Sequence, residues 1–189
     1  QAVGGGPGPI GCFEMAERLI ASGQEQGPIP QFHLSQNTEH SPVHNAWKER
    51  RAQLLEQDFP KDSVEVYSDY LVNRTPAYGM VGGLHDILQM SNGETYTVSR
   101  NEAEAAEKMY LECEGIDSLS PGSVALASLI QAVELGRVAP SDSVLLNISG
   151  GGVQQLKRDL EIEPLEVDLL MAKDDDINQI IELVNSRIS

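Results

Sequence analysis

The chain has 189 residues, of which 40% are hydrophobic and 22% charged, so it can bury a core and lacks the composition of a disordered protein. Asp and Glu outnumber Lys and Arg by 29 to 13, which gives a formal net charge of −16. This charge argues against nucleic acid as a partner, because the phosphate backbone would be repelled. A small anion can still bind where backbone N–H groups form its site.

No apolar run approaches the length of a membrane span and no basic signal-peptide region opens the chain, which indicates a cytoplasmic protein with no membrane partner. Cys12 and Cys113 lack C-x-x-C spacing, and the histidines lack metal-ligand spacing, so we expect two reduced, buried thiols and no metal. Gln1 follows no methionine, and the first residues resemble the end of a strand. We therefore expect the chain to be the C-terminal part of a longer protein.

A glycine-rich turn lies between a predicted strand end at Ala2-Val3 and a predicted helix from about Ile10 to Ala21. Glycines leave the backbone N–H groups of the turn unobstructed, and the start of a helix adds unpaired N–H donors and the positive end of its dipole. Pro9 suits the first turn of that helix, whereas Pro7 removes one donor from the turn. These features predict a phosphate cradle, although a glycine-rich turn alone is equally typical of a flexible terminus.

The next elements predict a βαβ unit followed by a mostly irregular stretch. Alternating residues 31–36 predict a strand, which completes the order strand, glycine turn, helix, strand. Residues 43–57 have a helical pattern, and we assign the positive cluster 48–51 to its solvated face rather than to an anion site. Residues 58–78 predict irregular backbone with a short helix, and a further helix follows Gly82-Gly83.

The second half of the chain predicts a further strand and helix series. Thr95–Val98 indicates a strand, and Ser99 with Glu102 has the spacing of a capping box for a helix over 101–113. The later predicted elements are an apolar helix at 121–135, a buried strand at 143–148, a second glycine turn at 149–152, a short helix at 153–160 and an amphipathic helix at 174–188. The fold class is therefore α/β, with an open, mostly parallel sheet, helices on both faces, and both glycine turns at the carboxyl edge, where ligands bind.

With both turns placed, the chain resembles the C-terminal half of fold-type-II pyridoxal-phosphate enzymes, the tryptophan synthase β-like group. Within it the chain is most similar to cysteate synthases, threonine synthase relatives that make L-cysteate for coenzyme M. The resemblance covers 1–160 and leaves 161–189 as an acidic helical tail. Seven stretches carry it in order: 1–4 with the glycine turn, 34–37, 45–47, 73–76, 81–84, 114–117 and 145–152.

The resemblance implies a set of site residues. Gly4, Gly5, Gly6 and Gly8 would hold the phosphate of pyridoxal 5'-phosphate, and Ser149 would face its pyridine nitrogen. Glu114 falls in a segment that the family keeps at the active site, with a plain helix-end acid as the alternative. Arg74 is our candidate for binding the substrate phosphate or sulfite, with a structural ion pair as the alternative. The Schiff-base lysine of the family lies in the N-terminal half, so we expect no catalytic lysine here and no activity without that half.

The implied reaction is β-replacement on O-phospho-L-serine with sulfite, which gives L-cysteate and phosphate, carried out by a homodimer. One alternative is a threonine synthase-type reaction on O-phosphohomoserine, and another is a non-catalytic domain that binds a phosphate ligand. An ordinary nucleotide-binding domain is disfavoured, because the glycine run is not a clean G-x-G-x-x-G followed by an acid at the end of the next strand.

Overall fold

The computed structural model describes residues 1–162 and 176–188, with side chains as far as residue 186. By its internal contacts the chain divides into two units, Gln1–Leu156 and Lys157–Ser189. Residues 163–175 and 189 of the expected acidic tail lie outside the described residues. Within the described parts, no helix is both long and apolar enough to cross a membrane.

The first unit is built on a small parallel sheet. Strand β1 (His33–Asn37) pairs with β2 (Glu94–Val98), with His33 opposite Glu94 and Asn37 opposite Val98. On the other side of β1, Ala2 forms a parallel bridge with Ser35. Four of the five residues of β1 are buried, as expected for a strand covered on both faces.

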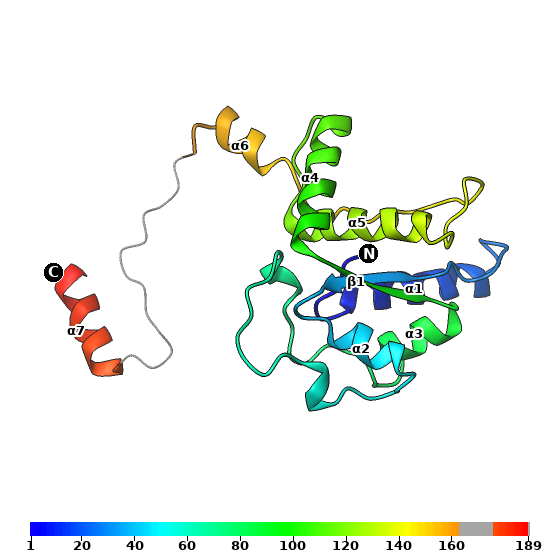
Figure 1. Cartoon of the computed structure of the whole chain (residues 1–189), viewed down its shortest axis with the longest axis horizontal. Coiled ribbons are helices and arrows are strands. Elements are labelled where there is room, and N and C mark those ends of the chain that lie inside the picture. The colour runs from blue at the N-terminus through cyan, green and yellow to red at the C-terminus, as the bar shows by residue number, and fades with distance from the viewer. Residues whose placement is uncertain (163–175, 189) are drawn as a thin grey trace. The chain divides into compact units, whose positions relative to one another are not determined.

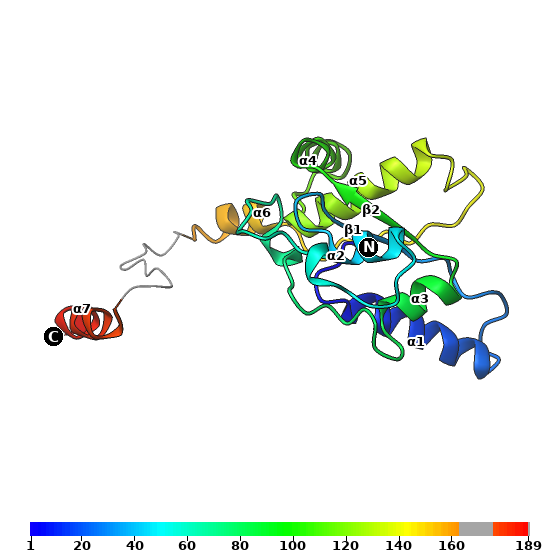
Figure 2. The same cartoon turned by 60° about the horizontal axis from the view of Figure 1, so that its bottom comes forward.

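Helices cover both faces of this sheet (Figures 1 and 2). One layer holds α1 (Pro7–Ala21), α2 (Pro42–Lys48) and α3 (Leu84–Met90), and the other holds α4 (Arg100–Glu114) and α5 (Ser120–Glu134). The remaining elements are the short 3-10 helices η1 (Glu56–Asp58) and η2 (Asp69–Leu71), with α6 (Val153–Asp159) and α7 (Ile177–Ile188) after them. The α/β architecture with a parallel sheet is therefore confirmed.

Side chains that alternate along the strands build two separate cores. Leu34 of β1 packs with Val43 of α2 and with Leu84 and Leu88 of α3. Val98 of β2 instead packs in a cluster with α4, α5 and η2; that cluster contains Leu71, Val98, Ala103, Ala106, Val124 and Ala127. Successive strand residues point to opposite faces, so each helix layer receives its own apolar set.

The capping box predicted for α4 is confirmed. The Ser99 hydroxyl accepts a hydrogen bond from the Glu102 N–H at 3.4 Å, and the Glu102 carboxylate accepts one from the Ser99 N–H at 2.8 Å. At the other end of α4, Gly115 has a φ of 71°, a left-handed conformation that glycine adopts without strain. Local sequence therefore sets both ends of this helix.

The helix predicted over 43–57 is wrong in its second half, because α2 ends at Lys48. Arg50 has a φ of 57°, which is left-handed and stops the helix. Arg51 lies beyond this turn and directs its guanidinium to Asp58. Arg51 is thus part of an ion pair and does not belong to a solvated helix face.

The strand predicted over 143–148 is also wrong. Its residues are irregular, and Leu145 is 92% exposed. A strand needs a neighbouring backbone to pair with, and no backbone hydrogen bond joins this segment to any other described residue. The two cysteines likewise differ from expectation: both are free, and both are exposed on their helices.

Candidate functional site

The first glycine turn presents a set of unpaired backbone donors. Gly6 is the N-cap of α1, with a φ of 99°, and the first bond of the helix runs from the Ile10 N–H to the Gly6 carbonyl at 3.2 Å. The N–H groups of Gly4, Gly5, Gly6 and Gly8 donate to no other described residue. Pro7 and Pro9 have no N–H, so these glycines supply all the donors of the turn. Unpaired N–H groups at the start of a helix suit a phosphate group.

Close packing fixes the backbone of this turn. The Gly5 carbonyl accepts a hydrogen bond from the Ala77 N–H at 2.9 Å. A Cβ atom at Gly4 would lie 3.0 Å from the Tyr70 carbonyl oxygen, and one at Gly6 would lie 2.9 Å from Leu84. Packing alone therefore favours glycine at Gly4 and Gly6. At Gly5 the nearest atom to such a Cβ is the amide nitrogen of Asn73, at 3.1 Å.

A buried pair at the end of β1 anchors the neighbouring segment. The Asn37 amide donates to the Ser68 carbonyl at 3.0 Å, and its oxygen accepts from the Ser68 N–H at 3.1 Å. Both residues are fully buried, so these bonds satisfy groups that could not reach water. The pair holds the start of η2, which contains Tyr70 and Leu71, against the sheet. The sequence analysis missed this pair, because 31 residues separate its members.

The second glycine turn packs beside the segment that leads into α5. The Leu119 N–H donates to the Gly150 carbonyl at 2.9 Å, and the Gly152 N–H donates to the Asp117 carbonyl at 2.8 Å. Asp117 also accepts from the N–H groups of Val153 and Gln154, and so caps α6. Ser149 and Glu114, which the sequence analysis selected, are both exposed at the ends of these two segments. The structure thus brings the 114–117 and 149–152 stretches together.

Both glycine turns lie near the carboxyl end of β1, although no hydrogen bond joins them within the described residues (Figure 1). Ser68 connects them. Its hydroxyl accepts from the Ser120 hydroxyl at 2.9 Å, next to Leu119, and its carbonyl accepts from the Leu71 N–H at 3.2 Å. Leu71 in turn lies against Gly4. The two glycine turns therefore lie at the carboxyl edge of the sheet, as expected from the sequence, but without a strand before the second turn.

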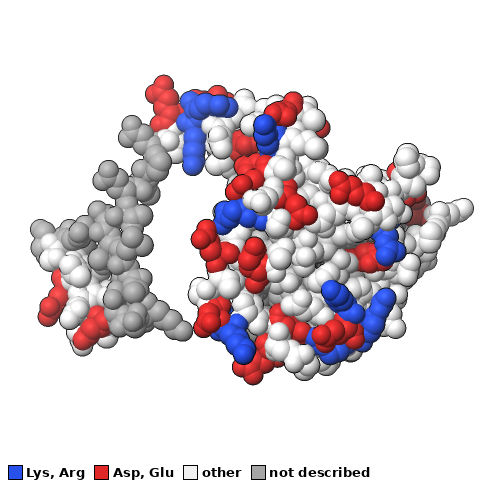
Figure 3. Space-filling model, in the orientation of Figure 1, with Lys and Arg blue, Asp and Glu red and all other residues white. Residues whose placement is uncertain are grey.

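Arg74 follows Asn73, whose side-chain amide lies close to Gly5 of the first turn. Its side chain is exposed, and no ion pair to it is found among the described residues. Elsewhere Lys and Arg side chains are interspersed with Asp and Glu, as the face in Figure 3 shows. An arginine without a carboxylate partner is free to bind an anion, which favours the ligand role over a structural ion pair.

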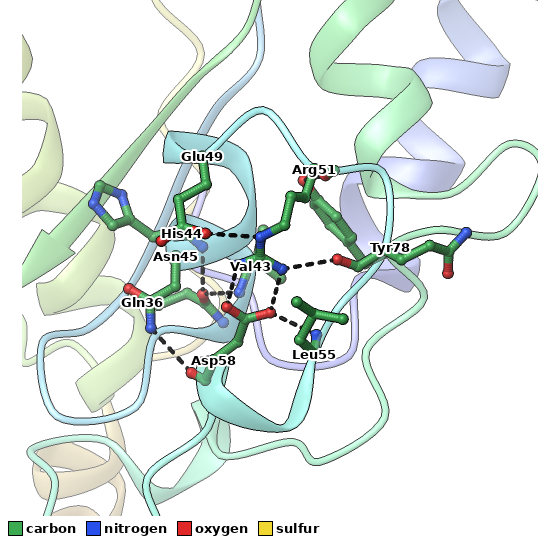
Figure 4. Close-up of polar contacts among 10 residues, drawn as sticks. Gln36, Val43, His44, Asn45, Glu49, Arg51, Leu55, Asp58 and Tyr78 are labelled. Carbon is green, nitrogen blue, oxygen red and sulfur yellow. Dashed lines mark hydrogen bonds and ion pairs between the residues drawn. The ribbon is translucent and has the colours of Figure 1, made fainter.

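Arg51 and Asp58 form the centre of a polar network that also includes Leu55 and Tyr78 (Figure 4). The Asp58 side chain is 2% exposed, forms two hydrogen bonds with the Arg51 guanidinium, and accepts from the Leu55 N–H at 2.7 Å. The Arg51 carbonyl accepts from the Tyr78 hydroxyl at 2.8 Å. Tyr78 follows Ala77, and the Ala77 N–H donates to the Gly5 carbonyl. The network is therefore connected to the first glycine turn through these two adjacent residues.

Two opposing effects set the pKa of Asp58. Burial alone would raise the pKa of Asp58, but the hydrogen bonds from Arg51 and Leu55 and the charge of Arg51 outweigh burial and hold it below its usual value. Burial raises the pKa of Tyr78 to about 12, so its hydroxyl stays protonated and donates.

A separate groove of about 1490 Å³ opens between α1, α5 and residues 137–148. Its walls include Phe32, Ala125, Leu129 and the exposed Leu145. Of the candidate site residues, only Gly8 lines it. The groove therefore lies beside the candidate site rather than within it.

Comparison with curated proteins shows similarity to cysteate synthases over nearly the whole chain. The chain is 41% identical over 182 residues to the enzyme of Methanosarcina barkeri and 42% identical over 170 residues to that of Methanocella arvoryzae. The matches cover 94% and 88% of this chain but 44% and 40% of those proteins. The chain thus spans less than half the length of these relatives, and the resemblance noted from its motifs is confirmed.

Solved structures show the same fold. A threonine deaminase from T.th. superposes with a TM-score of 0.50 at 20% identity, covering 74% of this chain and 44% of that one. An L-serine ammonia-lyase from Rhizomucor miehei gives a TM-score of 0.52 at 11% identity, covering 85% of this chain and 48% of that one. No protein-family model matches the chain.

Proposed function

We propose that this chain is part of a pyridoxal-phosphate enzyme that replaces the phosphate of O-phospho-L-serine with sulfite and releases L-cysteate and phosphate. The observation that carries the proposal is the set of four N–H groups at Gly4, Gly5, Gly6 and Gly8, next to the start of α1, that have no acceptor among the described residues. The similarity to cysteate synthases supports the choice of reaction. A homodimer and a cytoplasmic location stay predictions.

The residues of the first turn fit the phosphate of the cofactor. The turn offers four N–H donors without an acceptor among the described residues, and a Cβ at Gly4 or Gly6 would collide with its neighbours. When bound, pyridoxal phosphate supplies an electron sink that lets a β-substituent leave and a nucleophile add. Ser149 is our candidate partner for the pyridine nitrogen, because its neutral hydroxyl would leave that nitrogen largely unprotonated and favour replacement over transamination.

Arg74 is our candidate group for the substrate. Its guanidinium has no carboxylate partner among the described residues and can bind the phosphate of phosphoserine or the incoming sulfite. Glu114 stays our candidate for a residue close to the cofactor ring. The residues that follow it, 115–117, pack against the second glycine turn.

The rest of the protein would complete the fold and supply the Schiff-base lysine. Four of the residues 143–148 are apolar, and among the described residues this segment has no backbone partner and Ala2 makes no backbone hydrogen bond on the side away from β1. Residues 143–148 line the groove beside α1 and α5, whose apolar walls a strand from the remaining portion would cover. The relatives have more than twice the matched length, which provides such a portion.

The test uses the intact protein with pyridoxal phosphate and O-phospho-L-serine, with and without sulfite, and measures phosphate release and L-cysteate by mass spectrometry. Sulfite-dependent formation of both products is the expected result. Arg74→Ala should raise the KM for phosphoserine at least about tenfold, as for loss of a charge-assisted hydrogen bond, whereas Arg18→Ala, on the exposed face of α1, should not.

The same assay separates the alternatives. Turnover of O-phosphohomoserine to threonine, with none of phosphoserine, would replace the proposal with a threonine synthase-type reaction. Tight binding of a phosphate ligand without any turnover would leave a non-catalytic binding domain.

A further inference from the structure

We propose that the side-chain amide of Asn73 is a phosphate-binding group of the first glycine turn, a role that rests on the proposed function. It would add a side-chain donor at a turn where Pro7 removes a backbone donor.

The amide nitrogen of Asn73 faces Gly5. It lies 3.1 Å from where a Cβ of Gly5 would stand, so a side chain at position 5 would push the amide back by a few tenths of an ångström. The other end of the amide is fixed, because its oxygen accepts a hydrogen bond from the Thr75 N–H at 2.8 Å. An N–H donor must meet an oxygen, so this bond assigns the oxygen to Thr75 and leaves the amino group toward the turn.

The side-chain amino group of Asn73 has no acceptor among the described residues, whereas its side-chain oxygen and its backbone carbonyl are both hydrogen-bonded. The Asn73 carbonyl is hydrogen-bonded to Nε2 of His40 at 3.1 Å, and His40 is 2% exposed. The His40 ring lies against Phe59, at 6.1 Å between ring centroids, and Phe59 follows Asp58 of the Arg51 network. Asn73 is therefore a half-buried residue held on two sides, and its free donor is already in place before a ligand binds.

A purely structural role of Asn73 would use only its side-chain oxygen, which accepts the hydrogen bond from the Thr75 N–H. An aspartate or a serine can accept the Thr75 N–H in the same kind of turn, so that role would tolerate either residue. A phosphate-binding role needs the amino group. The two roles therefore differ in what Asn73→Asp does to ligand binding.

The experiment measures the dissociation constants of pyridoxal phosphate and of pyridoxal for the intact apoprotein, by absorbance titration. Asn73→Asp should weaken pyridoxal phosphate binding about tenfold to a hundredfold, because a donor to a charged group is lost and a carboxylate faces the phosphate. Pyridoxal, which has no phosphate, should bind as it does to the wild type. The matched control is Asn101→Asp, which adds the same charge at an exposed position of α4.

A second variant, Asn73→Ser, removes the amino group without adding charge and should weaken pyridoxal phosphate binding about tenfold. Unchanged pyridoxal phosphate affinity in both variants would overturn the proposal while the proposed function stood. Equal weakening of both ligands would also overturn it, because the loss would then come from a distorted turn. If the wild-type protein bound no pyridoxal phosphate, the proposed function would fall and this inference with it.

Discussion

Replacing Gly6 with alanine should destabilise the protein through both backbone strain and a steric collision. Gly6 has a φ of 99°, and a left-handed backbone costs a residue with a Cβ roughly 1–2 kcal/mol. The new methyl group would stand 2.9 Å from Cγ and Cδ1 of Leu84, which is fully buried. Overpacking of this kind costs about 1–3 kcal/mol. We therefore expect the free energy of unfolding to fall by about 2–5 kcal/mol, the sum of these two ranges.

The assay is urea unfolding followed by fluorescence of Trp47, the only tryptophan of the chain, which packs against the core that contains Leu84. Gly11→Ala is the matched control in the same helix. A Cβ there meets no atom within 4 Å, so the change should stabilise the protein by about 0.5–1 kcal/mol.

A double mutant tests the cause. Leu84→Ala removes the atoms that the new methyl group would meet, so Gly6→Ala should cost less in that background, with a coupling of about 1–3 kcal/mol. The reasoning is refuted if Gly6→Ala changes the free energy of unfolding by less than about 0.5 kcal/mol, the range of neutral surface changes. The reasoning is also refuted if Gly6→Ala lowers the free energy of unfolding by the same amount with and without Leu84→Ala.

The remaining predictions concern three other sites. The pKa of Asp58 lies below its ordinary value of 3.8 in the folded protein, so this group stabilises the fold above about pH 4 and the stabilisation is lost as the pH falls through the folded pKa. Asp58→Asn should therefore lower the urea midpoint at pH 7 and flatten its decline in acid; an equally steep decline would count against the Arg51 pairing. Ser99→Ala removes the cap of α4 and should cost about 1 kcal/mol, with Ser22→Ala, which lies after α1, as a near-neutral control. Leu145→Asp should leave the urea midpoint of the 189-residue chain unchanged, because Leu145 is 92% exposed, yet weaken assembly with the rest of the protein, measured by co-purification.

Local patterns predicted the elements whose stability is local. The capping box at Ser99, the β-branched run of β2 and the apolar helix α5 are each defined by near neighbours in sequence, and the structure has all three. The helix over 43–57 failed because the apolar pattern could not reveal the left-handed turn at Arg50, after which Arg51 bonds to Asp58 seven residues further on.

The candidate site divides in the same way. The free donors of the first turn follow from glycine, proline and the start of a helix, all adjacent in sequence. The Asn37–Ser68 pair and the approach of Asn73 to Gly5 join residues far apart in the chain, so only the fold reveals them. The strand over 143–148 depends on a partner backbone that no described residue supplies.

The unpaired segment 143–148 also determines how the chain would behave if it were produced by itself. Its six residues, Ser-Val-Leu-Leu-Asn-Ile, contain no charge and no proline, and Val144 and Leu145 are 50% and 92% exposed. Short uncharged segments of high β-propensity with free backbone groups are templates for intermolecular β-pairing. Copies of the isolated chain should therefore aggregate through this segment at high concentration, and covering it during synthesis would protect the nascent protein.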